Sequence, residues 1–238
     1  MKRLSKFTVG VLLPLILASL AAAASSDRTQ DVERIDHATR VFHSIMRTPD
    51  HAIPSDLLSS ARCIAIIPGE KQAAFLIGAK YGKGIVTCRT AHGWSAPAFL
   101  AIAGGSYGFQ IGAASTDIVM IFRNRHGLAD LLSDKFRVGA DATAAAGPVG
   151  RHVAAATNIT LHSEILTYAR SRGAFAGISL NGAVVQPDDS GNAAMYGPNA
   201  RTREILDGAV HAPVAARRLL VALRRYSPAP GETVASKR

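Results

Sequence analysis

The clearest evidence for a β-sheet lies in Lys83–Asp117, whose centre reads Gly93-Trp94-Ser95-Ala96-Pro97-Ala98-Phe99 and, further on, Gly104-Gly105-Ser106-Tyr107-Gly108-Phe109-Gln110-Ile111-Gly112. From Gly108 onward, every second residue lacks a bulky apolar side chain, whereas the residues between them are large and apolar. Successive side chains of a strand point to opposite faces, so this alternation predicts one buried face and one glycine-rich face. A face without Cβ atoms lets another backbone or a ligand approach closely.

The segments on both sides of this centre predict further short strands. They are Cys63–Ile67, Ala73–Lys80, Gly84–Arg89, Ala98–Ala103, Tyr107–Ala113, Asp117–Arg123, Lys135–Gly139, Ile159–Ala169 and Ala174–Leu180. Pro68-Gly69 is expected to stop the first strand, and Tyr81-Gly82-Lys83 and Asn181-Gly182 have the composition of hairpin turns. Many short strands separated by Gly-rich turns indicate an antiparallel sheet or a partial β-barrel.

Helical spacing of apolar residues occurs mainly near the two ends of the chain. Asp27–Arg47 is expected to form an amphipathic helix, and Pro213–Tyr226 a basic helix with interleaved leucines and arginines. Shorter helices are predicted for Pro54–Arg62, Arg125–Ser133, Asp188–Tyr196 and Thr202–Asp207. The predicted fold class is therefore α+β, with an antiparallel sheet or partial β-barrel, an N-terminal amphipathic helix and a C-terminal basic helix.

Residues 1–24 have the pattern of a signal peptide. Lys2, Arg3 and Lys6 precede the apolar run Val9–Leu20, and Ala22-Ala23-Ala24 offers a small-residue cleavage site. The apolar run is short for a membrane-spanning helix, and a retained N-terminal anchor is the alternative. We therefore expect residues 25–226 to form the domain and 227–238 a flexible tail. The expected location is periplasmic or secreted, with peripheral attachment to a membrane.

Positive charge is concentrated near the C-terminus. The chain carries a formal net charge of +10, and residues 201–238 contain eight Lys and Arg against three Asp and Glu. Such a segment suits an anionic partner. For an exported chain, lipid headgroups or envelope polymers fit better than nucleic acid.

The two cysteines, Cys63 and Cys88, both lie in predicted strands. An oxidising compartment would permit a disulfide between them, and two buried free thiols are the alternative. The spacing of cysteines and histidines does not match a metal site, so neither a metal nor another cofactor is predicted.

Several ordered motifs resemble the SYLF domain family. They are Ala65-Ile66-Ile67-Pro68, Tyr81-Gly82-Lys83-Gly84, Gly93-Trp94-Ser95-Ala96-Pro97, the run Gly104–Gly112, Lys135-Phe136 with Gly139-Ala140-Asp141-Ala142, Ala146-Gly147-Pro148-Val149-Gly150-Arg151 and Gly173-Ala174-Phe175-Ala176-Gly177. Together they span most of residues 31–226. The resemblance implies binding of phosphoinositides or other acidic lipids, with actin binding in fungal members. The leader, and a sequence without an SH3 or FYVE domain, differ from the eukaryotic members, so we do not expect actin to be the partner of this exported chain.

One short motif suggests an enzyme. Gly104-Gly105-Ser106-Tyr107-Gly108 matches the G-x-S-x-G pattern of a nucleophile elbow, in which a sharp strand-to-helix turn exposes the serine. The residues after Ser106 continue as a predicted strand, which favours a Gly-rich β segment over a catalytic turn. A serine hydrolase using Ser106 is therefore kept as a minor alternative, and no catalytic residue is assigned.

The sequence thus predicts an exported, non-enzymatic protein that binds acidic phospholipids through basic residues on a Gly-rich β scaffold. Basic side chains near an anionic bilayer each add about 1 kcal/mol of attraction. The candidate lipid-binding residues are Lys71, Lys80, Lys83, Arg89, Arg123, Arg125, Lys135, Arg137, Arg217, Arg218, Arg224 and Arg225. The alternative is an envelope structural module that binds another envelope protein. For the C-terminal helix, docking on lipid and docking on the sheet through its leucines both remain open.

Overall fold

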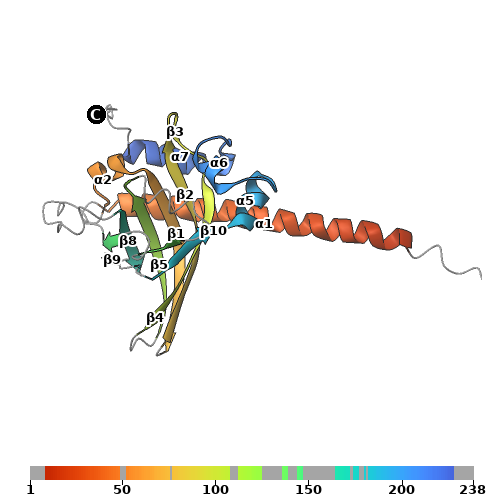
Figure 1. The fold of residues 1–238 in the computed structure, drawn as a ribbon, viewed down its shortest axis with the longest axis horizontal. Helices are drawn as coiled ribbons and strands as arrows, with labels where there is room; N and C mark the ends of the chain where they lie inside the picture. The colour runs from red at the N-terminus through yellow and green to blue at the C-terminus, as the bar shows by residue number, and fades with distance from the viewer. Residues whose placement is uncertain are drawn as a thin grey trace, which may run out of the picture.

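A computed structural model of the chain describes residues 9–48, 52–75, 77–107, 112–124, 136–138, 144–146, 164–171, 174–176, 180 and 182–227 (Figure 1). The strands within these ranges are β1 (Cys63–Phe75), β2 (Ile77–Thr90), β3 (Gly93–Trp94), β4 (Ala98–Tyr107), β5 (Gly112–Phe122), β6 (Phe136–Arg137), β7 (Ala144–Ala146), β8 (Ile165–Ser171), β9 (Ala174–Ala176) and β10 (Val184–Pro187). The helices are α1 (Val9–Met46), α2 (Ser55–Ser60), α5 (Asp189–Tyr196), α6 (Thr202–Leu206), the 3₁₀ turn η2 (Val214–Ala216) and α7 (Arg217–Tyr226).

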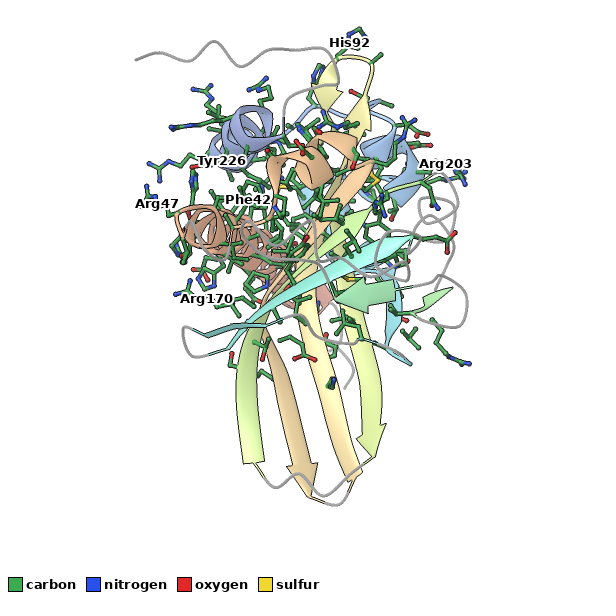
Figure 2. All side chains as sticks on the ribbon, turned by 90° about the vertical axis from the view of Figure 1, so that its left-hand side faces the viewer. Phe42, Arg47, His92, Arg170, Arg203 and Tyr226 are labelled. Atoms are coloured by element: carbon green, nitrogen blue, oxygen red, sulfur yellow. A yellow bond between two sulfur atoms is a disulfide. The ribbon has the colours of Figure 1, made fainter. Side chains whose placement is uncertain are left out.

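The described strands form one open sheet. Its order is β6-β10-β4-β2-β1-β5-β8-β7, with β3 added to β2 and β9 added to β8. Every pairing is antiparallel except that of β7 with β8. The predicted α+β class with an antiparallel sheet, an N-terminal helix and a C-terminal basic helix is confirmed. Figure 2 shows the far ends of β1, β2, β4 and β5 projecting beyond the helices.

Both faces of the sheet are covered near the helices, and the core is accordingly divided in two. Along β1, Cys63, Ala65 and Ile67 pack into one cluster, which α6 completes with Ile205 and Leu206. Ile64 and Ile66 point to the other face and pack with apolar residues of α1 and α7. Period-two alternation thus places two different apolar sets on the two faces. This is why the start of β1 reads as an unbroken apolar run.

The predicted stop at Pro68-Gly69 is wrong, because β1 continues through it to Phe75. The register of β1 shifts by one residue against β2 between Ile66 and Lys71, and against β5 between Ile67 and Glu70, which is a β-bulge. Gly69 takes a left-handed φ of 58° there, a conformation that glycine adopts without steric cost. The pair therefore bends a long strand and does not end it.

The predicted hairpin turn at Tyr81-Gly82-Lys83 is also wrong, and so is a separate strand Ala73–Lys80. These residues span the end of β1 and the interior of β2, whose first register pair is Phe75 with Ile77. Gly82 and Gly84 of β2 lie close to β1 at the bulge, where there is no room for a Cβ atom. A Cβ on Gly84 would lie 2.4 Å from the backbone oxygen of Ile66, and one on Gly82 would lie 2.6 Å from Cγ2 of Ile67. Close approach of two backbones explains them better than a turn does.

The two cysteines form a disulfide. Cys63 of β1 faces Cys88 of β2 directly in the register, and their sulfur atoms are 2.06 Å apart. Both side chains are buried in the cluster that includes Ala65 and Ile67. The bond cross-links neighbouring central strands, and the alternative of two free thiols is excluded for this structure.

The terminal helices match their predicted spans in part. The amphipathic stripe of α1 is confirmed, because Ile35, Ala38, Phe42 and Ile45 are fully buried. The helix begins at Val9 and includes most of the predicted leader, whose cleavage stays a prediction. Among the residues described, no helix combines the length and hydrophobicity needed to cross a bilayer. The predicted helix Arg125–Ser133, residues 108–111 of the glycine-rich stretch and the tail from 228 onward lie outside the described residues.

Candidate functional site

Helix α7 separates its charged residues from its apolar ones. Leu219 and Leu223 are fully buried against the sheet and α1, and Ala222 lies beside them. The four arginines are exposed and share the opposite face with Val221, which is 52 % exposed; they are Arg217, Arg218, Arg224 and Arg225. The 3.6-residue period places positions 217, 218, 221, 224 and 225 on this face. The helix therefore docks on the domain through its leucines and keeps its arginines in water.

A groove lies between α7 and α1, with a volume of about 860 Å³. Its lining residues on α1 are Asp36, Thr39, Arg40, His43 and Ser44, followed directly by Arg47 and Thr48, and on α7 they are Arg217, Arg218, Val221, Ala222 and Arg225. Five arginines thus face a single carboxylate, and that carboxylate, Asp36, is ion-paired with Arg40 one turn away. Among the described residues, no acid forms an ion pair with the arginines of α7. We call this feature the α1/α7 groove.

Aromatic contacts hold the two helices together at one end of the groove. The centre of the Tyr226 ring lies 6.0 Å from the centre of the Phe42 ring and 6.5 Å from that of His43, and both contacts are edge-to-face. Figure 2 looks toward the C-terminal end of α1 and shows Tyr226 between α7 and α1, with Arg47 at the outer side of α1. The edge-to-face contacts favour one fixed spacing of the helices, which keeps the arginines of the groove close to one another.

The positive charge of the groove acts on the imidazole of His43. Burial lowers the pKa of its imidazole below the ordinary value, and the nearby cations Arg47 and Arg225 lower it further. Two guanidinium groups, one directly after the end of α1 and one in α7, therefore act on the same ring. A site with this field favours an anion, and guanidinium groups donate paired hydrogen bonds to phosphate oxygens. The arrangement is suited to binding a phosphate-bearing group.

The structure distributes the predicted lipid-binding residues over several places. Arg217, Arg218 and Arg225 line the groove, and Arg224 lies on the same face of α7. Lys71 is exposed in β1, Lys80 is half-buried in β2, Arg123 is half-buried after β5, and Arg137 is exposed in β6. Arg125 and Lys135 lie outside the described residues.

Two predicted lipid-binding residues have structural partners instead. Lys83 forms an ion pair with the buried Asp188. Arg89 stacks on Trp94 with its guanidinium carbon 4.7 Å from the ring centre, and it donates hydrogen bonds to the backbone oxygens of Ala61, Leu58 and Ser227. Their cations are used in holding elements together, so we leave both residues out of the candidate site.

Sequence reasoning missed the contribution of α1. Arg40, His43 and Arg47 follow one another at three- and four-residue steps, which places them on one side of a helix. That spacing could have been recognised in the sequence, next to the apolar residues that include Phe42. The sequence pattern did not predict that α7 packs along the same side of α1.

The features that suggested an enzyme do not gain support. Ser106 lies inside β4, paired in register with Gly78 of β2, so its backbone lacks the strand-to-helix turn of a nucleophile elbow. Within the part of the chain that the structure describes, no group of three His, Cys, Asp or Glu side chains is arranged to hold a metal ion.

Comparison with known proteins identifies relatives. The model of the Ysc84 family, described as "Las17-binding protein actin regulator", matches residues 103–226. SH3 domain-containing YSC84-like protein 1 of Rattus norvegicus is 35% identical over 181 residues, which cover 75% of this chain and 53% of that protein. In Saccharomyces cerevisiae, Protein YSC84 is 34% identical over 175 residues, covering 72% of this chain and 37% of its own. LAS seventeen-binding protein 3 of the same species is 32% identical over 170 residues, covering 70% and 37%. The chain thus spans about half the length of the animal relatives it matches.

Proposed function

The chain belongs to the Ysc84 (SYLF) family, and from this premise we propose that it is an exported, non-enzymatic protein that binds acidic phospholipids at an envelope membrane surface through the α1/α7 groove. The observation that carries the proposal is the excess of five arginines over one carboxylate in that groove. The family is one of binding and regulatory proteins, which agrees with a role that needs no catalytic residue.

The size of the expected attraction fits a peripheral, reversible attachment. A basic side chain near an anionic bilayer contributes about 1 kcal/mol, so the unpaired arginines of the groove supply roughly 4 kcal/mol. An interaction of that size alone corresponds to millimolar affinity and weakens as salt is added. Val214 in η2 is 82 % exposed and Val221 in α7 is 52 % exposed, and both offer apolar contact with the interface.

Support for export comes from two independent features. Residues 1–24 have a basic, then apolar, then small-residue order typical of a signal peptide. The Cys63–Cys88 disulfide is of a kind that persists in oxidising compartments. An envelope location would expose the groove to phospholipid headgroups.

Vesicle flotation tests the proposal directly. The protein is mixed with vesicles of phosphatidylcholine, with and without phosphatidylglycerol, at low and high salt. We expect recovery with the anionic vesicles only, reduced by salt. Reversing two groove charges in Arg218→Glu/Arg225→Glu should weaken binding by at least about tenfold. Arg203→Glu is the matched control, because Arg203 is exposed on α6, away from Arg47 in Figure 2, and its loss should have little effect.

A second candidate function is the binding of another protein. The description of the family names Las17 binding and actin regulation, and the name of one yeast relative, LAS seventeen-binding protein 3, names binding to LAS seventeen; these are properties of those proteins. An envelope protein with an acidic surface, or actin itself, would meet the same cationic groove here. Co-sedimentation with actin filaments, together with flotation that fails to recover the protein on anionic vesicles, would favour this candidate over lipid binding.

A further inference from the structure

A second hollow lies on the other side of α1, between this helix and the bulge of β1. Its volume is about 640 Å³, and its lining residues are His37, Arg40, Val41, Ser44, Pro68, Gly69, Lys71, Ser115, Asp117 and Arg170. Arg40 and Ser44 line the α1/α7 groove as well. Figure 2 shows Arg170 below the end of α1 and Tyr226 above it, so the helix lies between the two concavities.

The second hollow also favours an anion. Three cations line it, Arg40 from α1, Lys71 from β1 and Arg170 from β8. The single carboxylate is Asp117, which accepts a hydrogen bond of 2.9 Å from the backbone N–H of Gly69. Arg170 donates a hydrogen bond to the hydroxyl of Ser44 and so remains directed at α1. The positive charge of this hollow therefore comes from three elements that the fold brings together, and Arg40 shares its charge with its ion-pair partner Asp36.

Arg40 and Ser44 are one helical turn apart, and they form one row of side chains along α1. Both residues line both hollows, so this row of side chains borders the two of them. A headgroup with a single phosphate can occupy one side of the row. A headgroup with two phosphates joined by a short linker can place one phosphate on each side.

We propose that the α1/α7 groove and the second hollow are two subsites for a phospholipid that carries two phosphate groups, with Arg40 between them. The inference rests on the proposed function and adds the class of lipid. It follows that binding to a diphosphate lipid uses Lys71 and Arg170 in addition to the arginines of the α1/α7 groove. Binding to a monophosphate lipid uses the arginines of that groove alone.

The test compares phosphatidylcholine vesicles that contain either diphosphatidylglycerol or phosphatidylglycerol at equal total phosphate charge. We expect the protein to prefer diphosphatidylglycerol by about thirtyfold, the effect of the two additional cations Lys71 and Arg170 at the headgroup. Lys71→Glu should abolish this preference and leave binding to phosphatidylglycerol within about twofold. Lys71 is exposed, so the variant is expected to fold, which circular dichroism verifies. Arg203→Glu should keep the preference.

The outcomes separate the two proposals. Equal binding to both vesicles by the unaltered protein overturns the two-phosphate inference and leaves acidic lipid binding intact. An equal loss on both vesicles in Lys71→Glu also overturns it, because Lys71 then acts through general surface charge. Absence of binding to either vesicle overturns the proposed function itself. A preference seen with soluble glycerol phosphates but not with vesicles shows that the site takes a free phosphate compound and overturns the lipid assignment.

Discussion

The ammonium nitrogen of Lys83 lies 2.9 Å from Oδ2 of Asp188, and this contact joins the middle of β2 to the start of α5. Arg34 of α1 approaches the same carboxylate oxygen at 2.8 Å. Asp188 also caps α5, because its other oxygen accepts a hydrogen bond from Ser190 and from the backbone N–H of Gly191. One buried carboxylate thus connects a strand and two helices that are far apart in sequence.

Replacing this carboxylate with an amide should destabilise the fold. In Asp188→Asn, the half-buried Arg34 and the 40 % exposed Lys83 would lose their common counterion. Breaking a fully buried pair costs about 3–5 kcal/mol, and the exposure of Lys83 brings our expectation down to about 2 kcal/mol in the free energy of unfolding. Urea unfolding at neutral pH measures this. Asp189→Asn is the control, since Asp189 is exposed, and an equal loss there would contradict the assignment.

The same contact predicts how stability depends on pH. Burial alone would raise the pKa of Asp188, but hydrogen bonds from Lys83, Ser190 and Arg34 outweigh burial and lower the pKa to about 2. A depressed carboxyl pKa contributes stability that is complete above the unfolded value of 3.8 and is lost as the pH falls to about 2. Unfolding measured between neutral pH and pH 2 should therefore show a smaller acid loss in Asp188→Asn than in the unaltered protein.

Much of this fold could be predicted from local sequence patterns, because the spacing of apolar residues along a helix or strand depends only on neighbouring residues. The apolar stripe around Phe42 in α1 and the leucines of α7 could both be assigned that way. The bulge at Gly69 could not, since glycine next to proline has the same composition in a turn and in a bent strand. The candidate site depends on α7 packing beside Arg47 from the far end of the chain, and no local pattern specifies such a contact.

Gly84 should be intolerant of even one added carbon. Its Cβ would lie 2.4 Å from the oxygen of Ile66, and that atom belongs to the backbone of the neighbouring strand. We expect Gly84→Ala to lower the free energy of unfolding by about 2–3 kcal/mol, the usual cost of overpacking. Gly93→Ala is an informative contrast, because nothing lies within 4 Å of its Cβ position and only its φ of 113° opposes alanine. Thermal unfolding should give the larger loss for Gly84; the reverse order would refute the close approach.

Arg89 should stabilise the C-terminal end of α7. Its guanidinium reaches the backbone oxygen of Ser227 at 2.8 Å while its Nε donates to Ala61 at 2.9 Å, which a lysine cannot reproduce because its ammonium is a point charge. We expect Arg89→Lys to lose about 2 kcal/mol of stability. The amide of Ser227, bonded to Leu223, should exchange faster with solvent. Arg62→Lys, at an exposed site beside β1, should change neither the stability nor the exchange of the Ser227 amide. If that exchange is unchanged in Arg89→Lys, Arg89 does not stabilise the end of α7.

Protonation of His43 should couple lipid binding to pH. In the free protein, burial and the cations Arg47 and Arg225 hold the pKa of His43 below 6.5. A phosphate in the α1/α7 groove would offset those cations and raise the pKa of His43. By linkage, the affinity for phosphatidylglycerol vesicles should then increase as the pH falls from 7, first through the pKa of His43 in the lipid-bound protein and then through its pKa in the free protein. An NMR titration of the imidazole with and without lipid measures the shift. His43→Gln should flatten the pH dependence of binding, whereas His92→Gln, at the exposed turn before β3, should not. A pKa of His43 that is unmoved by lipid would mean that the phosphate binds elsewhere than between these two helices.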